Sequence, residues 1–299
     1  MHKFLSFAAT FMILSALATP GLASDWEEDE GASKAPARSN PHKVTSPPSL
    51  QNRKSVDHES ETGKTAKGGG LILRGKVEHA QKLPPLQSGL QAGANFDPSS
   101  LGKAKYESKW LKIPNWFAGT FASDRTTITL MQDYATGRKS SPNKTVSSQA
   151  SEHFGFQRDA DGDIWHFYVE SGSSKSTQQN HETFNTIDWY GPELIAEDKL
   201  VMRILATSLI VDRNTGTIVD SYRREDIKTY QPLELRSLKV TYTSKSFDSR
   251  GRPRDLQEGY SIYRQVLPFT RINEAEGNDY KSMFRDYLVS HKLEHLVPR

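Results

Sequence analysis

Hydrophobic and polar residues alternate along most of the chain after residue 100. This period of two is typical of strands with one buried face. The stretches with this pattern are residues 126–134, 151–158, 163–170, 176–189, 216–226, 235–247 and 256–266. Residues 199–211 are more continuously apolar, as in a strand buried on both faces or a pair of short strands. Turn formers such as Asp161-Gly162 and Asn214-Thr215-Gly216 separate them. About eight or nine short strands of this kind predict an antiparallel sandwich or barrel, and the hairpin turns favour an up-and-down barrel.

The period changes to that of a helix over residues 278–296. The apolar side chains that fall on one helical face there are Tyr280, Met283, Phe284, Tyr287 and Leu288. Asn278 stands where it would cap the first turn. We therefore expect one C-terminal α-helix that packs its aromatic stripe on the outside of the barrel.

Residues 24–100 have a different composition, rich in Ser, Pro and Lys and almost without aromatic residues. Such a segment buries too little apolar area to offset chain entropy, which predicts a long disordered N-terminal segment. Its Leu83-Pro84-Pro85-Leu86 stretch has two interpretations, an extended docking motif or, as we favour, part of a spacer. Residues 101–299 then form one domain.

Residues 1–23 have the organisation of a secretory signal peptide. Lys3 supplies the basic start, an apolar core follows, and small residues precede a cleavage site expected after Ala23. The apolar run is shorter than the roughly 20 residues that span a bilayer, and no later stretch is long or apolar enough to do so. The sequence predicts a periplasmic or secreted protein with no transmembrane span after cleavage.

The chain contains no cysteine and has a net charge of only +3. The first fact excludes thiol catalysis, disulfides and Cys-based zinc sites. We also find no nucleophile elbow, phosphate-binding loop or dinucleotide motif. We therefore assign no catalytic residue and expect no cofactor, with an enzyme left as an unsupported alternative.

The densest aromatic stretch covers residues 110–121. Trp110 and Trp116 precede Gly119 and Phe121, and Pro114 limits helix formation between them. We interpret this stretch as the plug and first strand of the barrel. The four residues are expected to be structural.

This opening, followed by many strands and one helix, resembles lipocalins and related calycin barrels. The resemblance rests on Gly119-Thr120-Phe121, on strand order and on the C-terminal helix. It implies a calycin-like up-and-down barrel whose cup holds a small apolar ligand. It also implies that a late basic residue, Arg264 or Arg271, packs over the first tryptophan. Phe121 stands where that family has Trp, and the family disulfide is impossible here.

Two groups of residues have metal-binding chemistry. Asp159, Asp161 and Asp163 alternate in a turn that would suit calcium, but a strand-like run follows where an EF-hand has glycine and a helix. A polar hairpin turn is the preferred interpretation. The histidines that could converge on zinc or haem iron, though scattered positions are favoured, are His153, His166 and His181.

Nine Lys or Arg residues against four acids lie between residues 222 and 254. Such a run faces an anionic partner or, by default, water. Two functions follow. The first is an exported, non-catalytic binding protein with a small apolar ligand. The alternative is an envelope interaction protein that docks to a larger assembly or an anionic polymer through its tail and this basic strand face. Export argues against nucleic acid as a partner.

Overall fold

The computed structural model describes residues 77–101, 108–234, 236–275 and 277–298. The predicted signal peptide and residues 24–76 of the predicted tail lie outside the described residues. Within them the protein is mainly antiparallel β-structure with one α-helix near the C-terminus, as the hydrophobic pattern predicts.

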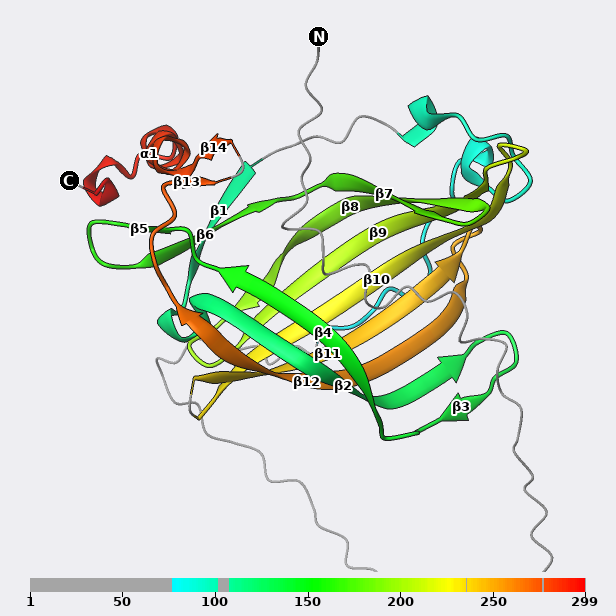
Figure 1. Cartoon of the computed structure of the whole chain (residues 1–299), viewed down its shortest axis with the longest axis horizontal. Helices are drawn as coiled ribbons and strands as arrows, with labels where there is room; N and C mark the ends of the chain where they lie inside the picture. Colours follow the sequence, from blue (N-terminus) through cyan, green and yellow to red (C-terminus); the bar gives the residue numbers. More distant parts are fainter. Residues whose placement is uncertain (1–76, 102–107, 235, 276, 299) are drawn as a thin grey trace, which may run out of the picture. The chain divides into compact units, whose positions relative to one another are not determined.

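Most strands belong to one antiparallel sheet (Figure 1). Its order is β3-β2-β12-β11-β10-β9-β8-β7, and β4 pairs with the remaining edge of β2. The strands are β2 (Gly119–Asp133), β3 (Lys139–Ser140), β4 (Lys144–Phe154), β7 (Gly172–Gln178), β8 (His181–Ile195), β9 (Leu200–Asp212), β10 (Ile218–Leu233), β11 (Ser237–Asp248) and β12 (Pro253–Pro268). From β7 to β12 the strands follow in chain order, which is the meander that the hairpin turns predict.

The expected closure into a barrel is not found among the described strands. At one edge β7 pairs with β8 alone, and at the other β4 pairs with β2 alone. The chain between β4 and β7 does not bridge these edges, because it forms β5 (Gln157–Arg158) and β6 (Ile164–Val169) instead. Strand β6 pairs with β1 (Ser108–Ile113) and β5 in a separate three-stranded sheet. A third, two-stranded sheet joins β13 (Glu274–Ala275) to β14 (Asn278–Asp279).

The large sheet is nevertheless curled. Strands β2, β12 and β11 lie between β4 and β10 in the sheet order, yet Glu152 of β4 contacts Lys228 and Tyr230 of β10. Figure 1 shows the same curvature from β4 and β2 round to β8 and β9. We call the face that carries Glu152 and Tyr230 the inner face and the opposite one the outer face.

Several strands are longer than predicted, and one predicted strand is two. Strand β12 has 16 residues and β2 has 15, so they extend well beyond their alternating stretches. Residues 176–189 form most of the β7–β8 hairpin, and Gln179 takes a positive φ of 39° in its turn. Side-chain alternation continues through a hairpin, which explains why the pattern did not show this turn.

Two clusters of mainly aromatic side chains form separate parts of the hydrophobic core. The first lies on the inner face of the large sheet. It contains Phe117 of the 3₁₀ turn η3 (Asn115–Phe117), Phe121, Phe154, Leu200 and Tyr230. The second joins the small sheet to the helix through Trp110, Trp165, Tyr280, Phe284 and Leu288. The stretch around residues 110–121 therefore contributes to both clusters, through β1 and through η3 with β2.

The helix α1 (Tyr280–Ser290) buries the predicted stripe, and a 3₁₀ turn, η4 (Glu294–Leu296), follows it. It packs on the small sheet rather than on the large one. The expected cap at Asn278 is wrong by one residue: Asp279 is the N-cap, and its carboxylate accepts a hydrogen bond from the Ser282 amide. Asn278 instead pairs with Ala275 in the short β13–β14 hairpin.

The predicted boundary at residue 101 is too late, because residues 77–101 are folded onto the outer face. We call this segment the strap; it includes the 3₁₀ turns η1 (Ser88–Leu90) and η2 (Pro98–Leu101). Its Leu83 and Leu86 amides donate to the carbonyls of Gly251 and Ser249. Leu86 and Leu90 pack with Leu209. The apolar residues that make this possible are few, which is why composition alone classed the segment with the tail.

Candidate functional site

The structure places the four residues of the predicted first-strand region in packed positions or close backbone contacts. Phe121 is 1% exposed in the first cluster, and Trp110 lies in the second. Trp116 donates its indole N–H to the Glu197 carbonyl at 2.5 Å. Gly119 has a φ of 133°, and a Cβ there would lie 2.7 Å from the Leu267 carbonyl oxygen. Only glycine fits this close approach of β2 to β12.

The inner face contains a buried carboxylate that joins three strands. Glu152 is 4% exposed and accepts hydrogen bonds from Lys228 Nζ at 2.9 Å and Tyr230 Oη at 3.0 Å. Tyr263 of β12 adds a third donor at 3.3 Å. A buried charge needs both a counter-charge and hydrogen bonds, and Glu152 has both. This Glu152 cluster fastens β4 across the curl.

The same carboxylate affects the tyrosines around it. Burial, followed by the negative charge of Glu152, raises the pKa of Tyr230 far above its usual value. The same two causes raise the pKa of Tyr263 and of Tyr190 on β8. All three phenols therefore stay protonated at any physiological pH, and Tyr230 and Tyr263 donate hydrogen bonds to Glu152.

A second polar row crosses the inner face beside this cluster. Asp226 accepts from Arg224 Nε at 3.0 Å and from Ser244 Oγ at 2.5 Å. On the neighbouring strands Ser246 donates to Asp255. Each charge in this row is thus matched by a partner on the sheet.

Tyr242 is the exception in this part of the inner face. Its hydroxyl is buried and has no hydrogen-bond partner among the described residues. Burial, and then the charge of Asp226, raise the pKa of Tyr242 to about 12, so the group is a donor at neutral pH. The phenol lies against Gly259, where a Cβ would come within 2.6 Å of the hydroxyl oxygen. An unpaired buried hydroxyl costs about 1–3 kcal/mol and points to a missing acceptor.

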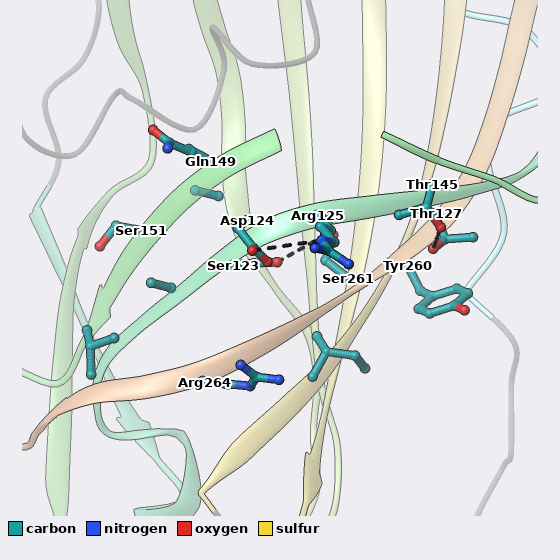
Figure 2. A pocket seen from close by; sticks show the side chains of 14 residues that line it. Ser123, Asp124, Arg125, Thr127, Thr145, Gln149, Ser151, Tyr260, Ser261 and Arg264 are labelled. Atoms are coloured by element: carbon teal, nitrogen blue, oxygen red, sulfur yellow. Dashed lines mark hydrogen bonds and ion pairs between the residues drawn. The ribbon is translucent and has the colours of Figure 1, made fainter. Parts of the chain in front are cut away.

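The outer face has an open depression where the ladder between β2 and β12 is interrupted (Figure 2). Pairing stops at Thr127–Tyr260 and resumes at Ala122–Arg264. The depression has a volume of about 1010 Å³. Its polar lining includes the side chains of Ser123, Asp124, Arg125, Thr127, Thr145, Gln149, Ser151, Tyr260, Ser261 and Arg264. Thr126 and Ser261 share a hydrogen bond at 2.9 Å across the gap.

Arg264 therefore lines this depression and does not pack over the first tryptophan, as the family resemblance implied. Arg271, the other basic residue considered for that role, is exposed. Neither forms a cation–aromatic contact with a tryptophan among the described residues.

The acidic turn is closed by Asp159 itself. Its Oδ1 accepts from the amides of Asp161 and Asp163, and its Oδ2 accepts from the Trp165 indole N–H at 2.8 Å. Asp163 forms an ion pair with Lys112. Among the described residues no group of three or more His, Asp or Glu side chains is placed to hold a metal ion. The preferred interpretation, a polar hairpin turn, fits this geometry.

The three histidines do not converge. His153 hydrogen-bonds to Thr120 and to the Gly155 carbonyl, and His166 accepts from the Gly155 amide at 3.3 Å. Burial, with a smaller effect from His153, lowers the pKa of His166 to about 3. His181 lies on β8, a strand that contacts neither β4 nor β6 in the sheets.

The basic run between residues 222 and 254 does not form one face. Arg224 and Lys228 point to the inner face, where Asp226 and Glu152 neutralise them. Alternate residues of the same strands point outward, and Lys245 donates to the Ala80 carbonyl of the strap. Near the strand ends, Arg252 and Arg254 pair with acidic residues.

The sequence pattern did not identify Glu152, Lys228, Tyr230 and Tyr263 as a group. Alternation places Lys228 and Tyr230 on one face, but it does not predict that β4 reaches them. That contact spans 76 residues between Glu152 and Lys228 and depends on the curl of the sheet. The combination of a carboxylate, an amine and phenols at alternating positions was the signal present in the sequence.

Comparisons with known proteins identify no relative. No family model matches the chain, and neither a curated protein nor a solved structure matches it significantly. Among the described residues, no helix has the length and apolar character needed to cross a bilayer.

Proposed function

We propose that this protein is an exported, non-catalytic binding protein with a calycin-like, incompletely closed barrel. Its inner face holds a small ligand with an apolar body and one hydrogen-bond acceptor. The observation that carries the proposal is the unpaired hydroxyl of Tyr242, a buried donor that faces the polar row of the inner face.

The neighbouring side chains support this ligand chemistry. Ile204 and Ala206 lie on the inner face opposite Asp226 and Arg224 in the β9–β10 ladder. They belong to none of the three hydrophobic clusters formed by the described residues. Ile204 is 7% and Ala206 1% exposed, so both contribute to an apolar wall, and the acceptor of the ligand would take the Tyr242 hydrogen bond. Binding sites commonly combine an apolar wall with a few placed polar groups.

The test compares a hydroxyl on each face. Native mass spectrometry of protein purified from its own host is expected to show a bound small molecule. Anilinonaphthalene sulfonate, an apolar ring system with an acceptor group, should bind and fluoresce. Tyr242→Phe should weaken that binding about 5-fold, because one hydrogen bond contributes about 1 kcal/mol. Tyr134→Phe removes a hydroxyl on the outer face, outside the depression between β2 and β12, and serves as the matched control.

Equal affinities of the two variants would show that the probe binds elsewhere. A protein that carries no small molecule, and whose fluorescence titration shows no saturable site, would contradict the proposal.

A further inference from the structure

The depression between β2 and β12 is a second site, independent of the inner face. The side chains of Tyr260, Ile262 and Arg264 point outward, because their neighbours Ser261 and Tyr263 contact Thr126 and Glu152 on the inner side. A ligand in the depression is therefore separated from Tyr242 by the sheet itself. The gap arises because residues of β12 between Tyr260 and Arg264 have no ladder partner on β2.

Cationic side chains outnumber acidic ones in the lining of the depression. Arg125 and Arg264 lie on opposite strands of the gap, and Asp124 is the single acid in the lining (Figure 2). Asp124 is 3.9 Å from Arg125, a weak exposed pair. The Arg264 guanidinium has no hydrogen bond or ion pair with the described residues, although its backbone pairs with Ala122 and Ser237. Lys239, on β11, adds a third cation 5.5 Å from the centre of the Tyr260 ring.

Neutral hydrogen-bonding groups fill the space between these cations. The hydroxyl groups of Ser123, Thr127 and Ser151 and the Gln149 amide line the depression. Hydroxyls and amides both donate and accept, so they match the paired donors and acceptors of sugar hydroxyls. Guanidinium groups match planar oxyanions in the same way. The lining has one aromatic ring, whereas single-stranded nucleic acid needs a series of stacking platforms.

We propose that this depression binds an anionic polysaccharide, with Arg125 and Arg264 on its carboxylate or sulfate groups and the hydroxyl lining on its sugar rings. Lys239 extends the cationic surface towards β11.

Four polymers that differ in backbone and in charge test this site on the full chain. Binding of dextran sulfate, polygalacturonate, neutral dextran and polyglutamate is measured by isothermal titration at 50 and 200 mM salt. We expect both anionic polysaccharides to bind, with affinity falling as salt rises. Neutral dextran should bind at least 10-fold more weakly. A preference between the two anionic polysaccharides would identify carboxylate or sulfate as the better oxyanion.

Two substitutions localise the binding. Arg264→Gln should weaken dextran sulfate binding at least 5-fold, while Arg250→Gln, the same charge change in the exposed β11–β12 turn outside the lining of the depression, should change it less than 2-fold. Unchanged thermal unfolding confirms that both variants are folded. Equal losses in the two variants would overturn the site, since they would reflect net charge alone. Polyglutamate binding as tight as that of polygalacturonate, or no binding of either polysaccharide at 50 mM salt, would overturn the polysaccharide assignment.

Discussion

The two faces of β10 both carry charged residues, but their partners come from different parts of the chain. On the inner face Lys228 and Tyr230 bind Glu152, a residue of the same sheet. On the outer face Glu225 accepts from His79 and from the Ala80 amide, both in the strap. Arg203 of β9 adds an ion pair to Glu225.

This difference separates a permanent contact from one that opens locally. The inner contact cannot break without straightening the curl, because β4 is fixed through β2 to the rest of the sheet. The outer contact depends on the strap, which few apolar side chains hold. Regions with few buried apolar contacts open at lower free energy than the core. We therefore expect substitutions on the two faces to differ in size and in range.

Glu152→Ala should have the largest effect. It leaves the Lys228 ammonium without its counter-charge in a site where that side chain is 13% exposed. Removal of one partner of a buried pair costs about 3–5 kcal/mol of unfolding free energy. Glu225→Ala is the matched outer variant and should cost less than half as much, because Arg203 keeps Glu193 at 2.7 Å. Urea denaturation measures both, and equal losses would refute the distinction between the faces.

The next-largest effect should come from acid, which should lower the free energy of unfolding through His166. The folded-state pKa of His166 is about 3, well below its ordinary value of 6.5, chiefly because the ring is buried. Above pH 6.5 this group leaves stability independent of pH. As the pH falls below 6.5, the unfolded chain takes up a proton that the folded protein does not. Unfolding free energy should therefore fall, by on the order of 3 kcal/mol at pH 4.

His166→Asn tests this assignment, since the amide can accept from the Gly155 N–H but does not titrate in this range. The variant should be less stable at pH 7 and should lose less stability between pH 7 and pH 4. His153, whose pKa burial also lowers, contributes part of the remaining slope in the same direction. An identical pH dependence in the variant and the wild type would contradict the assignment to His166.

Leu86→Ala should have the smallest and most local effect. The side chain is 6% exposed between the strap and the outer face. A buried Leu→Ala change costs roughly 2–5 kcal/mol, and we expect about 2 because the strap can adjust or detach. Hydrogen exchange should accelerate at the Leu83 and Leu86 amides and stay unchanged on the inner strands. Val219→Ala, at an exposed position of β10, is the control. Faster exchange across the whole sheet would mean that the strap belongs to the cooperative core.

The sequence predicts this molecule best where structure depends on neighbouring residues. Alternation located β6 and β11 nearly to their ends, a continuously apolar run located β9, and helical spacing located the buried face of α1. Gly216 and Gly251 have the positive φ values that their turns require. In each of these cases, residues close together in the chain determine the backbone and the burial.

What the sequence did not predict depends on contacts between distant residues. The open edges of the sheet result from β6 pairing with β1, and alternation carries no information about partners. The strap is ordered because Leu86 meets Leu209, a residue more than a hundred positions away. Whether the Tyr242 hydroxyl finds a hydrogen-bond partner depends on residues that are distant in the sequence but close in space. The candidate site could therefore be recognised only once the curl was known.

The pairing of β2 with β12 has a consequence for the order in which the chain acquires its structure. These strands lie more than a hundred residues apart in the chain, yet they are neighbours in the sheet. During synthesis the β8–β11 meander can form from local hairpins. Strands β2 and β4 can pair with each other, but they join the meander only after β12 has been synthesised. Closure of so long a loop is entropically costly and makes folding slow. Until it occurs, β2 and β11 each expose a long unpaired edge, so a chaperone that shields strand edges would have most to protect in this interval.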